Sequence, residues 1–454
     1  MMLNPNIFKA YDIRGIYPTE LNEELAYRIG RAFAEFIKSK VRKDRITVAV
    51  GQDMRNSSPA LFAEAVRGIC DQGVNAADIG LVSTPTFYFG VSYYGYDGGL
   101  QVSASHNPAQ YNGFKIVRAR AVPISGETGI MEIRDLAVKN EFPRIAEKGK
   151  VEKRSGVLAE QIKFALGYAD AKKIKPFKIA IDTANGMGGP MMEELFKYLP
   201  CRIEELFFEL DGNFPNHEAD PLKEANMKDL QKKVLGTGAD LGIALDGDAD
   251  RLFFVDDRGR TVEPAIVRGI LAKIFLRENP GAAICYDVRP GKITVDMIEE
   301  GGGVPVVTRV GHSLIKEKMA EVGAVFAGES SGHFFLKMPH GDFEAPEIMI
   351  LKILQELSES GRKFSEYVGP LYKYFHSGEI NFEVADKQAV FDRLKAKYGA
   401  NLKYDFDGMS FEFPDFWFNV RPSNTENKVR LNLEAISDKI MLEKTAEVSA
   451  IIKA

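Results

Sequence analysis

Three aspartates alternate along one short run of the chain, Asp246, Asp248 and Asp250, and Arg251 follows directly. Apolar segments that predict strands flank this run on both sides. Carboxylates this close repel one another, so an ordered loop tolerates them only if a cation lies among them. Hard oxygen ligands of this kind suit Mg²⁺ or Ca²⁺ and not zinc. Because the charge of Arg251 suits a phosphate, the run predicts a divalent cation beside an anionic ligand.

Two other interpretations of this run stay open. An EF-hand loop also begins with alternating aspartates, and Asp257 stands at its twelfth position. However, the sixth position is Arg251 where that loop requires glycine, and the flanking segments predict strands and not helices. A solvated acidic turn is the second alternative, which the apolar flanks disfavour.

A second polar segment, Gly99–Pro108, runs from a predicted strand into an Asn-Pro turn. Ser105 would lie exposed at the carboxyl end of this strand, where ligand sites of α/β sheets lie. No Gly-x-Ser-x-Gly pattern surrounds Ser105, so a hydrolase nucleophile is not supported. Lys115 follows within a short loop and offers a cation. The alternative is that Ser105, His106 and Asn107 only hydrogen-bond within a turn.

Two later loops contain groups that suit a sugar. The loop Gly328–His333 combines glycines, which allow close approach of a ligand, with Glu and Ser side chains that can hydrogen-bond hydroxyl groups. Gly311–Ser313 is a similar loop nearby in the sequence. Ordinary loops are the alternative for both, with His312 and His333 as structural histidines.

The segment Arg421–Thr425 joins two predicted strands. An arginine, two hydroxyls, an amide and backbone N–H groups within five residues would make a phosphate cradle. Arg430 could face the same way. A hairpin turn with a surface arginine is the alternative.

The composition favours a soluble enzyme. Hydrophobic residues make up 45% and charged residues 27% of the 454 residues, which is ordinary for globular proteins. The net charge of −5 argues against a general binder of nucleic acid or membrane surfaces. Three cysteines far apart in the sequence predict free thiols in a reducing compartment. No signal peptide or membrane-spanning run is expected, so we predict a cytoplasmic location.

The elements that must position these groups follow a repeated pattern. An apolar strand ending at an aspartate, then a turn and a helix, occurs at Ile46–Asp53, Lys178–Asp182 and Ala282–Asp287. This order implies parallel α/β units, and a repeat of about 105–130 residues fits three domains of one type. A charged stretch at 147–154 suggests a linker, the aspartate loop lies near a second boundary, and a third lies at 367–377.

The pattern changes after the third boundary. We predict a strand near 378–384, a helix over 387–397, strands near 405–413, 416–420 and 428–433, and a helix from Ser437. Such an order indicates a small α+β domain with a mostly antiparallel sheet. The predicted domains are therefore 1–150, 151–251, 252–369 and 370–454.

Together these segments resemble the phosphohexomutase family, in particular its phosphomannomutase/phosphoglucomutase group. The resemblance covers the whole chain in order, from Phe8–Gly15 through the serine, aspartate and Gly328–His333 segments to Arg421–Thr425. It implies an α/β fold of three similar α/β domains with mixed sheets, plus a C-terminal α+β lid domain, around a central cleft. The chain departs from the family at Asn427, where many members carry proline, and at 338–345, which lacks an expected Asp-Gly pair.

The resemblance also implies roles for single residues. Ser105, beside His106, would work as a phosphoserine, with Asp246, Asp248 and Asp250 holding Mg²⁺ next to it. The remaining roles fall into three groups: Lys115, Arg14 and His333 near the reacting oxygens; Glu329, Ser331, Gly311, His312, Arg251 and Arg289 around the sugar phosphate; Arg421, Ser423, Asn424, Thr425 and Arg430 at the distal phosphate.

The expected reaction moves phosphate between C1 and C6 of mannose or glucose phosphate through a bound 1,6-bisphosphate, with Mg²⁺ as cofactor and hexose 1,6-bisphosphate as activator. Hexose phosphates are the only expected partners, and the oligomeric state stays open. Alternatives are a phosphoglucosamine mutase, whose members tend to carry glycine where Asn424 stands, a Mg²⁺-dependent sugar phosphatase, and a non-catalytic sugar-phosphate binding protein. A phosphatase needs a site open to water, whereas a bisphosphate intermediate must be kept from water. The intact Ser105 and aspartates argue against a non-catalytic protein.

Overall fold

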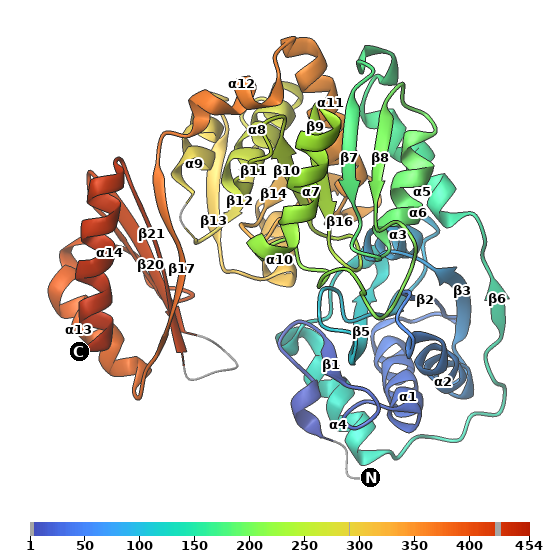
Figure 1. Cartoon of the computed structure of the whole chain (residues 1–454). Coiled ribbons are helices and arrows are strands. Elements are labelled where there is room, and N and C mark those ends of the chain that lie inside the picture. Colours follow the sequence, from blue (N-terminus) through green and yellow to red (C-terminus); the bar gives the residue numbers. More distant parts are fainter. Residues whose placement is uncertain (1–3, 290, 423–427) are drawn as a thin grey trace. The chain divides into compact units, whose positions relative to one another are not determined.

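The computed structural model describes residues 4–289, 291–422 and 428–454 and divides into two compact units (Figure 1). The first unit contains the chain up to Val262 together with Ser331–Ser365, and the second contains Glu263–Ser330 and Glu366–Ala454. The prediction of α/β domains with mixed sheets, followed by an α+β domain, is confirmed. Among the described helices, none combines the length and the apolarity that crossing a bilayer requires.

The first sheet of the first unit is built around parallel strands. Its central strand β2 is buried on both faces, which explains its nearly continuous apolar sequence. The helix after it buries Leu61, Ala65 and Ile69, which are spaced four residues apart and so share one side of the helix. The strand order is β1 (Ile13–Ile16), β5 (Tyr111–Arg118), β4 (Gly98–Val102), β2 (Thr47–Gln52), β3 (Asn75–Leu81) and β6 (Val151–Lys153). The helices are α1 (Glu23–Lys40), α2 (Ser58–Asp71), α3 (Thr84–Tyr93) and α4 (Met131–Lys139).

The second sheet of this unit carries the aspartate run. Its order is β11 (Thr261–Val262), β10 (Leu252–Asp256), β9 (Leu241–Leu245), β7 (Lys178–Asp182) and β8 (Arg202–Leu206). Strands β9 and β10 pair as an antiparallel hairpin, so residues 246–251 form the loop between two fully buried strands. The helices are α5 (Val157–Ala165), α6 (Gly188–Phe196) and α7 (Glu224–Thr237), and the unit also contains the hairpin β15 (Phe334–Met338) and β16 (Gly341–Glu344) and the helix α11 (Pro346–Ser360).

The second unit begins with a parallel α/β layer. Strand β12 (Ala283–Asp287) pairs in parallel with β13 (Val304–Thr308) and β14 (Phe326–Gly328). The helices of this layer are α8 (Pro264–Glu278), α9 (Lys292–Glu300) and α10 (His312–Val322).

The last sheet of the second unit is antiparallel, as predicted, in the order β17 (Phe375–Glu383), β21 (Lys428–Ala435), β20 (Phe416–Pro422), β19 (Met409–Glu412) and β18 (Leu402–Tyr404). Helices α13 (Lys387–Tyr398) and α14 (Asp438–Lys453) cover one of its faces (Figure 1). Apolar side chains such as Phe418, Leu431 and Leu433 form the core beneath these helices. The alternating residues therefore point to the opposite, helix-free face.

One predicted strand has other bounds in the structure. The strand predicted near 405–413 is present as β19, but it begins only at Met409, because Asp407 and Gly408 adopt positive φ and make a turn between β18 and β19. An Asp-Gly pair favours such a hairpin turn, so this signal was present in the sequence.

Candidate active site

The three aspartates of the β9–β10 loop lie together in the interior. Their side chains are almost fully buried, and their carboxylate oxygens lie within 4.8 Å of one another. One oxygen of Asp246 accepts the backbone N–H groups of Asp250 at 3.0 Å and Arg251 at 3.1 Å, which closes the loop. The loop therefore presents its remaining carboxylate oxygens in one cluster.

The charges of this cluster fit a divalent cation. Burial and the neighbouring Asp250 and Asp248 raise the pKa of Asp246 well above its usual value. Burial alone would also raise the pKa of Asp250, but Lys115 and His333 hold it well below its usual range. In the described part of the chain, the buried Oδ1 of Asp248 has no hydrogen-bond partner. A buried carboxylate oxygen without a hydrogen-bond partner, next to two further carboxylates, is a suitable ligand for Mg²⁺ or Ca²⁺.

Ser105 lies directly against the aspartate loop and is buried there, so the prediction that it would be exposed is wrong. Its hydroxyl donates to Asp246 Oδ2 at 3.0 Å and lies 3.2 Å from His106 Nδ1. The backbone of Ser105 has a φ of 50°, in the left-handed region that non-glycine residues rarely adopt. A Cβ at Gly247 would come within 2.5 Å of the Ser105 carbonyl oxygen, so only glycine allows the two loops to approach this closely. The fold thus places one hydroxyl beside three carboxylates.

Lys115 and His333 contact the same cluster. Lys115 was predicted in a short loop but lies in strand β5, and its Nζ is 2.7 Å from Asp250 Oδ2 and 3.1 Å from Asp248 Oδ2. Burial would lower the pKa of Lys115, but these two carboxylates raise it well above its usual value, so the ammonium stays charged. His333 Nε2 lies 3.2 Å from Asp250 Oδ1, and its Nδ1 lies 2.9 Å from the Ser331 hydroxyl.

Arg14, His106 and Arg251 complete the predicted set in the first unit. Arg14 Nη1 donates to Asn107 Oδ1 at 2.6 Å, next to the serine loop. Burial, with the nearby Arg251 and Arg14, lowers the pKa of His106 well below its usual value, so this imidazole is neutral at neutral pH. Arg251 Nη1 lies 3.3 Å from Asp220 Oδ1. The structure therefore brings together every residue of the first unit that we predicted for the reacting end.

Arg55 is a central residue of this site that the sequence analysis missed. It is fully buried, and its two terminal nitrogens donate to the backbone carbonyls of Ser105, Asn107, Pro108 and Tyr111 at 2.6–2.9 Å. One guanidinium group thereby holds the whole turn that carries Ser105. The signal was available, because Arg55 follows the predicted strand Ile46–Asp53 at the same carboxyl edge as Ser105.

Thr84 is a second missed residue. Its hydroxyl donates to Asp248 Oδ2 at 2.6 Å and its backbone N–H to the Asp248 carbonyl at 3.0 Å. These bonds orient the carboxylate whose other oxygen lacks a partner. Nothing in the sequence around Thr84 indicates this contact with a loop 164 residues away.

A second cluster of predicted residues lies in the second unit, around Asp287 at the end of β12. The buried carboxylate of Asp287 accepts from the Arg289 guanidinium at 2.6 Å and from the Ser330 backbone N–H at 2.6 Å. Burial would raise the pKa of Asp287, but Arg289 and Arg268 lower it to about 2. The Gly311 N–H, just before His312 at the start of α10, donates to Glu329 Oε1 at 2.7 Å. Arg289, Glu329 and Gly311 therefore occupy one edge of this layer.

The helix-free face of the last sheet carries Arg421 and Arg430, which stand directly opposite each other in β20 and β21. Glu379 of β17 pairs with both, at 3.0 Å to Arg421 and 3.5 Å to Arg430. The other predicted cradle residues, Ser423, Asn424 and Thr425, lie outside the described residues, as does Asn427.

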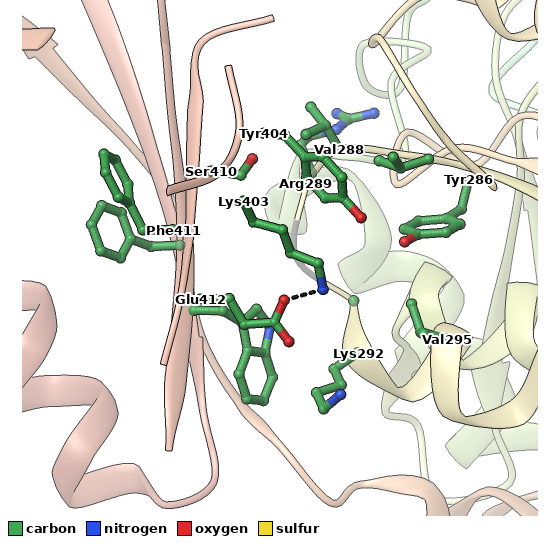
Figure 2. A pocket seen from close by; sticks show the side chains of 14 residues that line it. Tyr286, Val288, Arg289, Lys292, Val295, Lys403, Tyr404, Ser410, Phe411 and Glu412 are labelled. Carbon is green, nitrogen blue, oxygen red and sulfur yellow. Dashed lines mark ion pairs between the residues drawn. The ribbon is translucent and has the colours of Figure 1, made fainter. Parts of the chain in front are cut away.

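A pocket of the second unit lies between the last sheet and the β12–α9 segment (Figure 2). Tyr286, Arg289 and Lys292 line it from the β12–α9 side, and Lys403 and Glu412, which form an ion pair, line it from the sheet side. Arg289 thus lies between the Asp287 cluster and the sheet.

Comparison with known proteins gives matches along almost the whole chain. Four family models match in sequence order: Phosphoglucomutase/phosphomannomutase alpha/beta/alpha domain I over residues 5–144, domain II over 158–259, domain III over 264–375, and the C-terminal domain over 379–451. A phosphomannomutase of Vibrio cholerae is 40% identical over 456 residues, which cover 98% of each chain. A protein of Xanthomonas campestris named phosphohexose mutases is also 40% identical, over 98% of this chain and 99% of its own length.

A solved structure is similar over the same length. The crystal structure of a phosphoglucomutase/phosphomannomutase family protein from Burkholderia thailandensis has a TM-score of 0.90 and 33% sequence identity, and the match covers 100% of this chain and 98% of that one.

Proposed function

We propose that this chain, which belongs to the phosphoglucomutase/phosphomannomutase family, is a phosphohexomutase that moves phosphate between C1 and C6 of mannose or glucose phosphate. The observation that carries the proposal is the Ser105 hydroxyl, buried and 3.0 Å from Asp246 within a cluster of three carboxylates, Lys115 and His333. Such a cluster offsets the charge of a phosphoryl group on that hydroxyl.

In the proposed reaction Ser105 carries the phosphoryl group. The bond from its Oγ to phosphorus breaks as a bond from phosphorus to a substrate hydroxyl forms, and the proton of that hydroxyl ends on Oγ. The product is a hexose 1,6-bisphosphate, which turns end for end and returns its other phosphate to Ser105. Lys115, Arg14 and His333 surround Ser105 with positive or hydrogen-bonding groups, and neutral His106 contacts its oxygen. Positioning and charge neutralisation supply most of the catalysis of such transfers.

The aspartate cluster is the proposed Mg²⁺ site. Asp246, Asp248 and Asp250 would hold the ion together with an oxygen at Ser105, and the unpartnered Asp248 Oδ1 supports this assignment. When bound, Mg²⁺ supplies charge stabilisation to the transferring phosphoryl group. Lys115 shares two of these carboxylates, so its charge keeps the acidic cluster tolerable.

The second unit supplies the proposed sugar and distal-phosphate groups. Glu329, Gly311, His312 and Arg289, with Ser331 and Arg251 of the first unit, are assigned to the sugar phosphate. Arg421 and Arg430, with Ser423, Asn424 and Thr425, are assigned to the distal phosphate. In the described part of the chain, the buried Nε–H groups of Arg421 and Arg430 lack hydrogen-bond partners, which supports a role for both in binding an anion. We assign residues 370–454 to a lid domain that closes on this phosphate, after the predicted domains 1–150, 151–251 and 252–369.

The phosphorylation of Ser105 is the central test. The intact mass of the purified protein, after incubation with glucose 1,6-bisphosphate, should show a phosphate increment that Ser105→Ala lacks. The matched control is Ser39→Ala in α1, whose hydroxyl donates to the Phe36 carbonyl within the helix. If Ser105→Ala keeps mutase activity near that of the unaltered protein, the assignment of Ser105 is wrong.

Substrate choice separates the mutase from its alternatives. Glucose 1-phosphate and mannose 1-phosphate, which differ only at C2, should turn over with comparable kcat/KM, because no residue is assigned to C2. A pocket without a polar contact at that carbon cannot reject an epimer strongly, so a preference beyond about 10³-fold would show that an unassigned residue contacts C2. Faster turnover of glucosamine 1-phosphate would favour the phosphoglucosamine mutase, and release of inorganic phosphate would favour a phosphatase. A cytoplasmic location and activation by hexose 1,6-bisphosphate remain part of this proposal.

A further inference from the structure

Two arginines directly opposite each other on neighbouring strands need an anion between them. Arg421 and Arg430 form such a cross-strand pair in β20 and β21, on the helix-free face of the last sheet. Like charges in this position repel and destabilise the strand pairing. Their side chains are only 11% and 28% exposed, so water screens this repulsion incompletely.

Glu379 supplies that anion from the neighbouring strand. Its Oε2 accepts from Arg421 Nη2 at 3.0 Å, and its Oε1 lies 3.5 Å from Arg430 Nη1. Burial would raise the pKa of Glu379, but Arg421, Arg430 and Arg289 lower it, so the group is ionised at neutral pH. A carboxylate with one oxygen toward each of two guanidinium groups occupies the position that a phosphate would need.

Other titratable groups near this site do not change its charge balance at neutral pH. Arg289 acts on Glu379 from the β12 layer, and burial together with Arg289 lowers the pKa of His376 to about 4, so His376 is neutral. Asn432, opposite Glu379 in β21, contributes an amide 3.5 Å from Glu379 Oε2. Glu379 is therefore the acidic group in direct contact with both cradle arginines in the described structure.

The position of Glu379 also limits how far it can withdraw. Residue 379 is paired with Asn432 in the β17–β21 ladder, directly after the irregularity between His376 and Glu379. The backbone therefore keeps the carboxylate within side-chain reach of the arginines when another anion arrives. A bound phosphate would displace the carboxylate from the guanidinium groups, but the nearby negative charge of Glu379 would still repel it.

We propose that Glu379 is a positioning residue of the distal-phosphate site that substitutes for phosphate when the site is empty and weakens phosphate binding when the site is filled. This inference rests on the proposed function, in which Arg421 and Arg430 bind the distal phosphate. A bisphosphate must leave this site to turn end for end, so a cradle that holds phosphate too tightly would stop the reaction at the intermediate. Glu379 reduces the affinity of the cradle and so permits the turn.

The alternative role for Glu379 is structural, and it predicts the opposite result. If the carboxylate only orients the two arginines, its removal would loosen them and weaken the binding of phosphate. If it competes with phosphate, its removal strengthens binding. The sign of the change in affinity therefore separates the two roles.

Calorimetric binding of glucose 6-phosphate in a Ser105→Ala background measures this sign without turnover. We expect Glu379→Gln to bind about 5- to 30-fold more tightly, because a unit charge is removed a few ångströms from a phosphate near the surface. In otherwise unaltered enzyme, Glu379→Gln should lower both KM and kcat, because release of the distal phosphate becomes slow. Glu379→Asp, which withdraws the carboxylate by one methylene, should tighten binding in the same direction by a smaller factor and serves where the Gln variant does not fold.

Glu383→Gln is the matched control, since it makes the same change on the same strand at a side chain that is 87% exposed and 4.0 Å from Lys428. It should leave affinity and turnover unchanged. Unchanged or weaker binding of glucose 6-phosphate by both Glu379 variants would overturn the inference. Arg421→Ala distinguishes this failure from failure of the proposed function, because unchanged binding by Arg421→Ala would mean that the cradle itself is misassigned.

Discussion

Arg55 offers the sharpest test of how the fold positions Ser105. The proposed change is Arg55→Lys, which keeps the charge but replaces two terminal nitrogens by one. In the structure Nη2 donates to the carbonyls of Ser105 and Asn107, and Nη1 donates to those of Pro108 and Tyr111. A single ammonium nitrogen can serve one of these pairs and not both, because the planar fork of arginine is lost.

The size of the effect follows from the two carbonyls that lose their donor. A buried acceptor left without a partner costs about 1–3 kcal/mol, so the turn loses about 2–6 kcal/mol. The lower end applies if water reaches the pair at Pro108, which is exposed. Ser105, in the turn after β4, also holds a φ of 50°, so the energy is lost from the conformation that presents the hydroxyl. A loss of about 2 kcal/mol reduces the competent population about 30-fold.

We therefore expect Arg55→Lys to lower kcat/KM for glucose 1-phosphate about 30-fold or more and the melting temperature by about 4–8 °C. The fraction of Ser105 phosphorylated by glucose 1,6-bisphosphate, read by intact mass, should fall with it, which a general loss of stability at low temperature would not cause. Arg45→Lys, at an exposed position of the same unit, is the control and should change neither quantity. Normal phosphorylation and turnover in Arg55→Lys would refute the claim that the guanidinium holds the serine turn.

Two further predictions concern the metal and pH. Chelation of divalent cations should abolish turnover but lower the melting temperature by only a few degrees, because the α/β layers of the first unit have their own apolar cores. Unfolding of the protein on chelation would instead make the site structural. Asp248→Asn should likewise lose most activity. Glu347, buried with its Oε1 accepting from Gln161 at 3.0 Å, has its pKa raised by burial from 4.5 to about 7, so the folded state holds a proton that the unfolded state releases. The free energy of unfolding of the unaltered protein should therefore fall as pH rises from about 4.5 through 7. Glu347→Gln should gain up to about 3 kcal/mol of stability relative to the unaltered protein by pH 8. A difference in melting temperature between the two proteins that is the same at pH 5 and pH 8 would contradict this.

Much of the reacting end could be predicted from the sequence, because its residues follow local rules. Apolar strands that end at Asp53, Asp182 and Asp287 indicated repeated α/β units, and the structure has parallel strands at each of these positions. The aspartate run indicated a cation site because its carboxylates are spaced closely along one loop. Ser105 was predicted from its place after a strand, and the structure brings its hydroxyl to Asp246, which follows a strand of another sheet.

The contacts that the sequence did not reveal join segments far apart along the chain. Arg55 reaches a turn about 50 residues away, Thr84 a loop 164 residues away, and Glu379 an arginine 42 residues away. The local sequence around each of these side chains is equally compatible with an exposed polar group or a helix cap. Only the tertiary arrangement determines which distant carbonyl or guanidinium group it meets, and no periodicity encodes that choice.

Lys115 in the first unit and the pair Arg421 and Arg430 in the second unit share one electrostatic arrangement, which bears on how a mutase of this kind works. In the first unit Lys115 is held by Asp248 and Asp250, and in the second Arg421 and Arg430 are held by Glu379. In both, buried or half-buried cations that could bind a phosphate are already paired with carboxylates of the protein. A phosphate that enters must replace an existing ion pair, so its binding free energy is less favourable than the charge of the cations alone would give. Under the proposed function, a bisphosphate that has to exchange its two ends needs neither end to be held irreversibly, and resident carboxylates at both sites would provide that balance.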